Sequence, residues 1–219
     1  MRKRNIALIL AASMMATFAF GGTTAFAAEE GETDSVTVGI MADPENMGPW
    51  SGMSMGRIAV LFTTYEYLIT REDGVAYGVL AKSWDEVDPK TYDVELYDYI
   101  HDAEGNPLTA SDVVFSFESA IATKNYGKLS VIDSVTATDD YHVEFKFNKD
   151  LEIGEFENVM LECAIVTQAA YEASPDQMAT TPVGTSAYLV DSYVPGSEIV
   201  MKETGDYWQT DESLEHETS

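Results

Sequence analysis

Four methionines lie close together near the start of the sequence, and thioether sulfur is a ligand for soft Cu(I). They are Met41, Met47, Met53 and Met55. No histidine or cysteine accompanies them, and flexible methionine side chains also fill irregular apolar gaps. Copper binding and packing of the loop are therefore both open. The sequence favours packing, and we predict no metal site and no cofactor.

Other residue types needed for catalysis are sparse. Cys163 is the only cysteine, and its apolar neighbours at 164–166 are typical of a small buried side chain rather than a nucleophile. The histidines are His101, His142 and His216. Their spacing matches no metal site, and we expect Asp139 and Asp140 to form a hairpin turn rather than the acid–base pair of a hydrolase. We therefore predict that the chain is not an enzyme.

The composition is that of a strongly acidic globular protein. The 219 residues include 38 acidic and 12 basic side chains, so the net charge is −26, while 45% of the residues are hydrophobic. A polyanion is repelled by nucleic-acid phosphates, which excludes nucleic acid as a partner. The hydrophobic content is sufficient for a sizeable core in one or two domains.

The first 27 residues have the pattern of a secretory signal. Basic residues at 2–4 precede an apolar stretch at 6–20, and residues 25–27 form a small-x-small cleavage site. The residue directly after that site is not a cysteine, so we predict a secreted protein without a lipid anchor there. It would lie in the periplasm or on the extracellular face of the cell envelope. An acidic leader at 28–35 and a polar tail at 209–219 are expected to flank the folded part.

The middle of the chain predicts a strand, a polar turn and a capped helix. Tyr92, Val94 and Leu96 alternate with polar residues, the pattern of a strand with one buried face. The turn-forming cluster 102–107 must end that strand. Thr109 then stands at a helix N-cap, with Asp112 three residues later. Apolar residues follow at helical spacing: Val113, Val114, Phe117, Ala120 and Ile121.

The remaining pattern is an irregular alternation of strands and helices, which favours a mixed α/β fold. Strands are expected at 36–40, 131–138, 141–147, 164–166, 188–190 and 199–201. Helices are expected at 57–68, 151–162 and 168–173. For the helix at 57–68, we expect one face to carry Ile58, Leu61, Phe62 and Tyr65.

Eight short blocks of sequence, in a fixed order, carry a family resemblance. They are Met47–Trp50, Tyr65–Leu68, Ala81–Trp84, Tyr92–Leu96, His101–Asp102, Pro107–Ser116, Thr181–Tyr188 and Gly205–Trp208. In type and order these blocks closely resemble the extracellular solute-binding proteins of family 5, the peptide/nickel class. Those proteins capture substrates for ABC importers. The chain departs from the family pattern at Ser186-Ala187, where the family usually has Gly-Pro.

The resemblance implies a fold and a binding site. The fold would be an incomplete lobe of the periplasmic-binding-protein type II class, with residues 28–65 and 163–208 building the main sheet and 66–162 forming an inserted α+β subdomain. By spacing, the extended edge that pairs with the ligand backbone would be Met53, Ser54, Met55 and Gly56. A ligand-facing aromatic residue after the central helix would be Tyr126.

The resemblance covers only the N-terminal part of the family, without its second lobe. The leading hypothesis is a secreted, monomeric binding component of an ABC importer, whose partners are a peptide or another small solute and the membrane permease. The alternative is a secreted interaction module, or a gene-fragment relic of such a binding protein, that takes no part in transport.

Overall fold

The computed structural model describes residues 37–209, and all but the first two belong to a unit that begins at Gly39. Its helices are α2 (Met55–Thr64), α3 (Ala110–Thr123), the 3-10 helix η1 (Gly127–Val131), α4 (Glu155–Met160) and α5 (Gln168–Ala173). Its strands are β1 (Ile69–Glu72), β2 (Val75–Gly78), β3 (Ala81–Asp88), β4 (Thr91–Leu96), β5 (Ile132–Ala137), β6 (His142–Phe147), β7 (Tyr188–Val194) and β8 (Glu198–Glu203). No described helix is long and apolar enough to span a membrane. These helices and strands form a mixed α/β fold, which confirms the predicted fold class.

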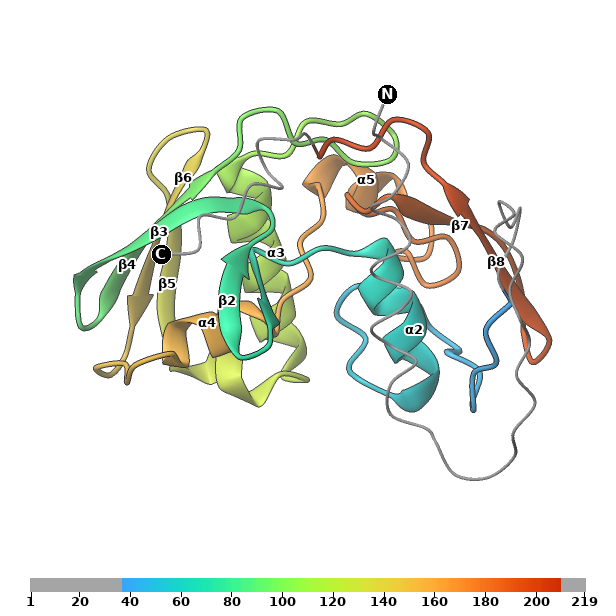
Figure 1. Ribbon diagram of the computed structural model, residues 1–219, viewed down its shortest axis with the longest axis horizontal. Helices are drawn as coiled ribbons and strands as arrows, with labels where there is room; N and C mark the ends of the chain where they lie inside the picture. Colours follow the sequence, from blue (N-terminus) through green and yellow to red (C-terminus); the bar gives the residue numbers. More distant parts are fainter. Residues whose placement is uncertain (1–36, 210–219) are drawn as a thin grey trace. The chain divides into compact units, whose positions relative to one another are not determined.

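A four-stranded antiparallel sheet in the order β3-β4-β6-β5 carries the core (Figure 1). The alternation in β4 behaves as predicted: Tyr92, Val94 and Leu96 are buried, with exposed fractions of 8%, 0% and 2%. The predicted hairpin is also confirmed, because β5 and β6 pair with Val135 opposite Phe145. Helix α3 contacts β5 and β6 and covers one face of the sheet.

Aromatic side chains fill the space between this sheet and its helices. The rings of Phe117 on α3 and Phe145 on β6 meet edge to face, with centroids 4.9 Å apart. On β4, Tyr92 stacks on Phe156 of α4 at 4.2 Å. Ring pairs of this kind add about 0.5–1.5 kcal/mol to the free energy of unfolding beyond their buried area. The predicted helix around residue 156 thus exists, and its apolar face is part of the core.

The predicted cap of α3 is present and also serves a second helix. One oxygen of the Asp112 carboxylate accepts hydrogen bonds from the backbone N–H (2.8 Å) and the hydroxyl (2.9 Å) of Thr109. The other oxygen accepts from the backbone N–H of Gln168 at 2.8 Å, at the start of α5. One carboxylate therefore joins the N-terminal ends of α3 and α5.

We expect Asp112→Ala to lower the free energy of unfolding by about 2 kcal/mol, because it removes a helix cap and leaves the Gln168 N–H without its acceptor. Urea denaturation followed by circular dichroism measures this effect. Glu118→Ala is the matched control, since Glu118 is an exposed carboxylate on the same helix. Equal stability of the two variants would contradict a structural role for the Asp112 bridge.

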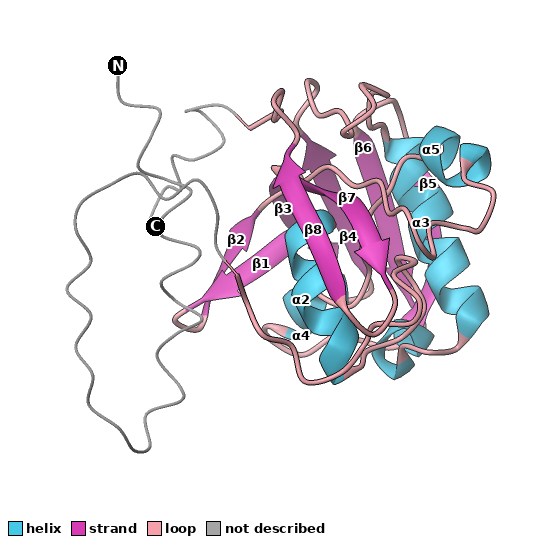
Figure 2. Ribbon diagram, turned by 90° about the vertical axis from the view of Figure 1, so that its right-hand side faces the viewer, coloured by secondary structure: helices cyan, strands magenta, loops and turns pink. Residues whose placement is uncertain are grey.

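Helix α2 begins and faces differently from the prediction. It spans Met55–Thr64, and its buried residues are Gly56, Val60, Leu61 and Thr64. The predicted face included Phe62, which is 45% exposed and lies against the ring of Tyr67. The prediction was wrong for Phe62 because helical spacing also fits the side of α2 that carries Val60. Val60 packs in a cluster with Val190 of β7, and α2 contacts β7. Figure 2 shows α2 behind β7 and β8.

Two predicted strands do not form as such. Residues 37–40 are not in a strand; Val38 is 72% exposed, and an extended segment needs a neighbouring strand to bond to. Residues 164–166 make only an isolated bridge, between Ile165 and Glu66. The backbone of Val166 instead exchanges two hydrogen bonds with the Ser116 hydroxyl on α3, at 3.1 and 3.2 Å.

The predicted hairpin near the end of the chain forms, with Val190 opposite Met201. Within 28–65 and 163–208, the described strands are β7 and β8, so a larger main sheet is not built from these ranges in residues 37–209. The division into a partial lobe and an insert stays a prediction. The predicted signal, the acidic leader and all but the first residue of the predicted tail lie outside the described residues.

Candidate functional site

A loop anchored in the core precedes α2 and carries the predicted binding segment. The indole N–H of Trp50 donates to the carbonyl of Ala164 at 3.0 Å, and the N–H of Met47 donates to the carbonyl of Ala179 at 2.8 Å. Both side chains are buried, with exposed fractions of 4% and 0%. The packing role favoured for the methionines therefore holds for Met47. The anchors fix the position at which the chain reaches residue 53.

Arg57 closes this loop from the helix side. Its Nε donates to the carbonyls of Pro44 (3.0 Å) and Asn46 (2.9 Å), and a terminal guanidinium nitrogen donates to Ser51 at 2.9 Å. These bonds tie the loop to the first turn of α2. Because the guanidinium acts on three carbonyl groups of its own chain, Arg57 serves here to shape the segment.

The predicted extended edge is only half extended. Ser54 has φ −146° and ψ 161° and caps α2, since its side chain accepts from the N–H of Arg57 at 3.3 Å. Met55 and Gly56 already belong to the helix. The prediction of an extended backbone was therefore wrong for these two residues. The cause is local: a serine followed by a helical apolar run is an N-cap signal that the spacing argument overlooked.

The segment nevertheless presents unused hydrogen-bond donors. No described residue accepts a hydrogen bond from the backbone N–H groups of Met53, Ser54, Met55 or Gly56. Met53 and Met55 are 51% and 65% exposed, so the packing interpretation is wrong for their side chains. The segment therefore offers backbone donors between two exposed thioethers.

Gly56 is buried and brings another part of the chain next to this segment. A Cβ at Gly56 would lie 2.5 Å from the carbonyl oxygen of Ala42 and 2.6 Å from that of Asp43. The backbone at 42–43 thus packs directly on the first turn of α2. Met41, 87% exposed, adjoins this contact. Three exposed methionines consequently flank one short backbone junction.

Tyr126 belongs to the core in this structure. Its side chain is 8% exposed, and its hydroxyl lies 3.4 Å from the carbonyl of Pro49, to which it donates. The next residue back, Asn125, donates from its side-chain amide to the carbonyl of Trp50 at 3.0 Å. Tyr126 supports the loop that carries the predicted segment, and direct contact of its ring with a ligand stays a prediction.

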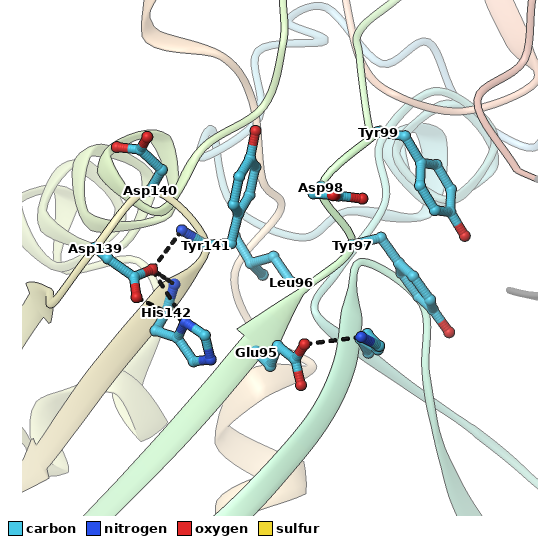
Figure 3. A pocket seen from close by; sticks show the side chains of 10 residues that line it. Glu95, Leu96, Tyr97, Asp98, Tyr99, Asp139, Asp140, Tyr141 and His142 are labelled. Atoms are coloured by element: carbon cyan, nitrogen blue, oxygen red, sulfur yellow. Dashed lines mark hydrogen bonds and ion pairs between the residues drawn. The ribbon is translucent and has the colours of Figure 1, made fainter.

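A separate hollow of about 610 Å³ lies where the end of β4 meets the β5–β6 turn (Figure 3). Its lining is acidic and aromatic: Lys82, Glu95, Leu96, Tyr97, Asp98, Tyr99, Asp139, Asp140, Tyr141 and His142. Sequence reasoning gave no sign of it, because its tyrosines come from two segments whose pairing depends on the sheet. None of the predicted site residues lies in it.

Ion pairs within the hollow account for two of its carboxylates. Lys82 lies 2.8 Å from Glu95, and the hydrogen bond from Lys82 lowers the pKa of that carboxyl. Asp139 accepts from the backbone N–H groups of Tyr141 and His142, each at 2.8 Å, confirming the predicted turn. Its hydrogen bond also raises the pKa of the His142 ring. No described group of acidic, histidine or cysteine side chains is placed to hold a metal ion.

Comparison with known proteins decides the family. Residues 76–216, more than half of the chain, match the family described as bacterial extracellular solute-binding proteins, family 5 (Middle). The chain belongs to family 5. Its members are solute-binding proteins and not enzymes, which confirms the predicted resemblance and the prediction that the chain catalyses no reaction.

Three relatives illustrate this membership of family 5. The nickel-binding protein NikA of Staphylococcus aureus is 30% identical over 151 residues, which cover 68% of the chain and 30% of NikA. The ABC transporter substrate-binding protein CtaP of Listeria monocytogenes is 28% identical, with a TM-score of 0.65 over 76% of the chain and 36% of CtaP. The oligopeptide-binding protein AppA of Bacillus subtilis, solved with a nonapeptide, has a TM-score of 0.68 at 22% identity, over 76% of the chain and 35% of AppA.

The chain therefore spans about a third of the length of these relatives. Their shared fold is the periplasmic-binding-protein type II fold, so the predicted fold class is confirmed. The family is extracellular by description, in agreement with the predicted side of the membrane.

Proposed function

We propose that this chain is a solute-binding component of an ABC importer and that it binds peptides through the segment Met53–Gly56. The observation that carries the proposal is the run of N–H groups at Met53, Ser54 and Met55, just before the buried Gly56, for which no described residue is the acceptor. A ligand backbone supplies carbonyl acceptors whatever its side chains are, so such a run suits peptides of many sequences.

Membership of family 5 supports the class of function, and the titles of relatives support the type of ligand. CtaP is named as a substrate-binding protein of an ABC transporter, and AppA was solved with a nonapeptide. NikA is named for nickel, so relatives of this chain differ in the ligand for which they are named. We propose a peptide, because its backbone carbonyl groups match the exposed N–H donors of the segment.

Export and partners complete the proposal. Residues 1–27 would direct the chain across the membrane as a cleaved signal, and the loaded protein would act as a monomer that docks on a membrane permease. Recognition would be equilibrium binding without bond breaking. The aromatic Tyr126 would act mainly by holding the loop through its bond to Pro49.

Peptide titration with a backbone-donor variant tests this function. We expect tri- to nonapeptides to bind the purified chain in isothermal titration calorimetry, and Met55→Pro to weaken binding about ten-fold, because proline fits the first position of α2 but removes one backbone donor. Met55→Leu is the matched control: it keeps the backbone N–H and an apolar side chain, and it should bind within about two-fold. Absence of peptide binding to the folded wild-type chain would refute the proposal.

A further inference from the structure

The exposed methionines of the described chain occur in one place. Met47, Met160 and Met178 are fully buried, whereas Met41, Met53 and Met55 are 87%, 51% and 65% exposed. Burying such side chains is favourable, so leaving three of them in water has a cost that most loops avoid. The structure brings the three to the junction where residues 42–43 pack on Gly56. We call Met41, Met53 and Met55 the methionine patch.

Two of the three charged groups beside the methionine patch are bonded to other parts of the chain. The Asp43 carboxylate accepts hydrogen bonds from the Tyr193 hydroxyl and the Gly196 N–H, which lower its pKa. The Arg57 guanidinium donates to three backbone carbonyls. Among these neighbours, Glu45 alone is an exposed charged side chain for which the described residues supply no ion pair. The charged atoms of Asp43 and Arg57 are therefore directed to groups of the chain itself, and the thioethers are the surface that a ligand side chain would meet.

We infer that the methionine patch sets ligand preference, and that it selects peptides with apolar side chains over acidic or basic ones. The inference rests on the proposed function, since it assigns a specificity to the same segment. Unbranched thioether side chains are flexible and polarisable, so they adapt to apolar groups of different shape. The donors at 53–56 would hold the ligand backbone while the thioethers contact the side chains next to it.

Chemistry separates this role from copper binding. Cu(I) is also held by thioethers, but no described group of histidine, cysteine or acidic side chains is placed beside these methionines to hold a metal ion. The same surface therefore suits a peptide side chain better than a soft metal ion.

The test compares three peptides that differ at one residue, Ala-Leu-Ala, Ala-Glu-Ala and Ala-Lys-Ala, by calorimetry on the full chain. We expect the leucine peptide to bind at least about ten-fold more tightly than the other two. Changing all three patch residues to glutamine should remove that preference, because glutamine keeps the length but not the apolar character. The triple change to leucine should retain it.

The outcomes distinguish the two proposals. If no peptide binds, the proposed function and this inference both fail. If peptides bind but the lysine or glutamate peptide is preferred, or if the glutamine variant keeps the leucine preference, the function stands and the methionine patch is not the specificity surface. Tight binding of Ag(I), a stable mimic of Cu(I), with no leucine preference would assign the patch to a soft metal instead. Thermal melts of each variant establish that folding is unchanged.

Discussion

Gly184→Ala is expected to lower the free energy of unfolding by about 3 kcal/mol or more. A Cβ at this position would lie 1.9 Å from the carbonyl oxygen of Thr64 and 3.1 Å from the ring of Tyr65. Neither neighbour can yield easily, because Thr64 is in the last turn of α2 and the Tyr65 hydroxyl is bonded to the Met47 carbonyl at 2.9 Å. The backbone at Gly184 would have to move.

Such a movement would break a further contact, since the carbonyl of Gly184 accepts a hydrogen bond from the N–H of Ala103 at 3.0 Å. For a chain of this size, about 3 kcal/mol corresponds to a fall in melting temperature of roughly 6–12 °C. Differential scanning calorimetry measures it. Gly127→Ala is the matched control, because nothing lies within 4 Å of a Cβ there, and it should change stability by less than about 0.5 kcal/mol. Equal melting of both variants would show that the contact at Gly184 is not tight.

The contrast between these glycines shows what a sequence can reveal. Local patterns were sufficient for the cap formed by Thr109 and Asp112 and for the hairpin of β5 and β6, because alternation and capping act within a few residues. Nothing in the sequence indicates that Gly184 meets Thr64, since the two are far apart along the chain. Contacts of that kind depend on the finished fold.

The candidate site was predictable in part for the same reason. Its position was expected from the resemblance, and the segment does expose backbone donors. The expected conformation was wrong because Ser54 starts a helix one residue later. The exposure of Met53 and Met55 could not be foreseen, since a methionine in an irregular loop is equally compatible with burial, as Met47 shows.

A second long-range contact fixes the segment that contains the last family block. The Glu66 carboxylate accepts hydrogen bonds from the Tyr207 hydroxyl at 2.5 Å and the Trp208 indole N–H at 2.8 Å. Trp208 is 4% exposed and lies near the rings of Tyr97 and Tyr99, at 6.0 and 6.2 Å. One carboxylate therefore holds residues 207–208 against the rest of the fold.

Glu66→Ala should lower the free energy of unfolding by about 3 kcal/mol, because two donors lose their acceptor. Glu72→Ala, at an exposed carboxylate in β1, is the control and should cost less than about 0.5 kcal/mol. Urea denaturation followed by circular dichroism measures both. If Glu66→Ala were as stable as the control, the two hydrogen bonds would contribute no net stability.

The dependence on pH gives a sharper test of the same carboxylate. Burial raises the pKa of Glu66 above its ordinary value of 4.5, against the opposing effect of its hydrogen bonds. The folded chain then holds this proton more tightly than the unfolded chain. The stability that Glu66 contributes in this way is present below about pH 4.5 and is lost as the pH rises through the pKa of Glu66 in the folded chain. Glutamine resembles the protonated side chain and does not titrate.

We therefore expect Glu66→Gln to lower the free energy of unfolding, relative to the wild type, by more at pH 4 than at pH 7. Denaturation midpoints of both proteins at the two pH values give this difference directly, and the other carboxylates cancel because both proteins share them. A larger penalty at pH 7 would mean that the hydrogen bonds from Tyr207 and Trp208 outweigh burial and lower the pKa of Glu66. The sign of this difference thus shows whether burial or hydrogen bonding has the larger effect on the pKa of Glu66.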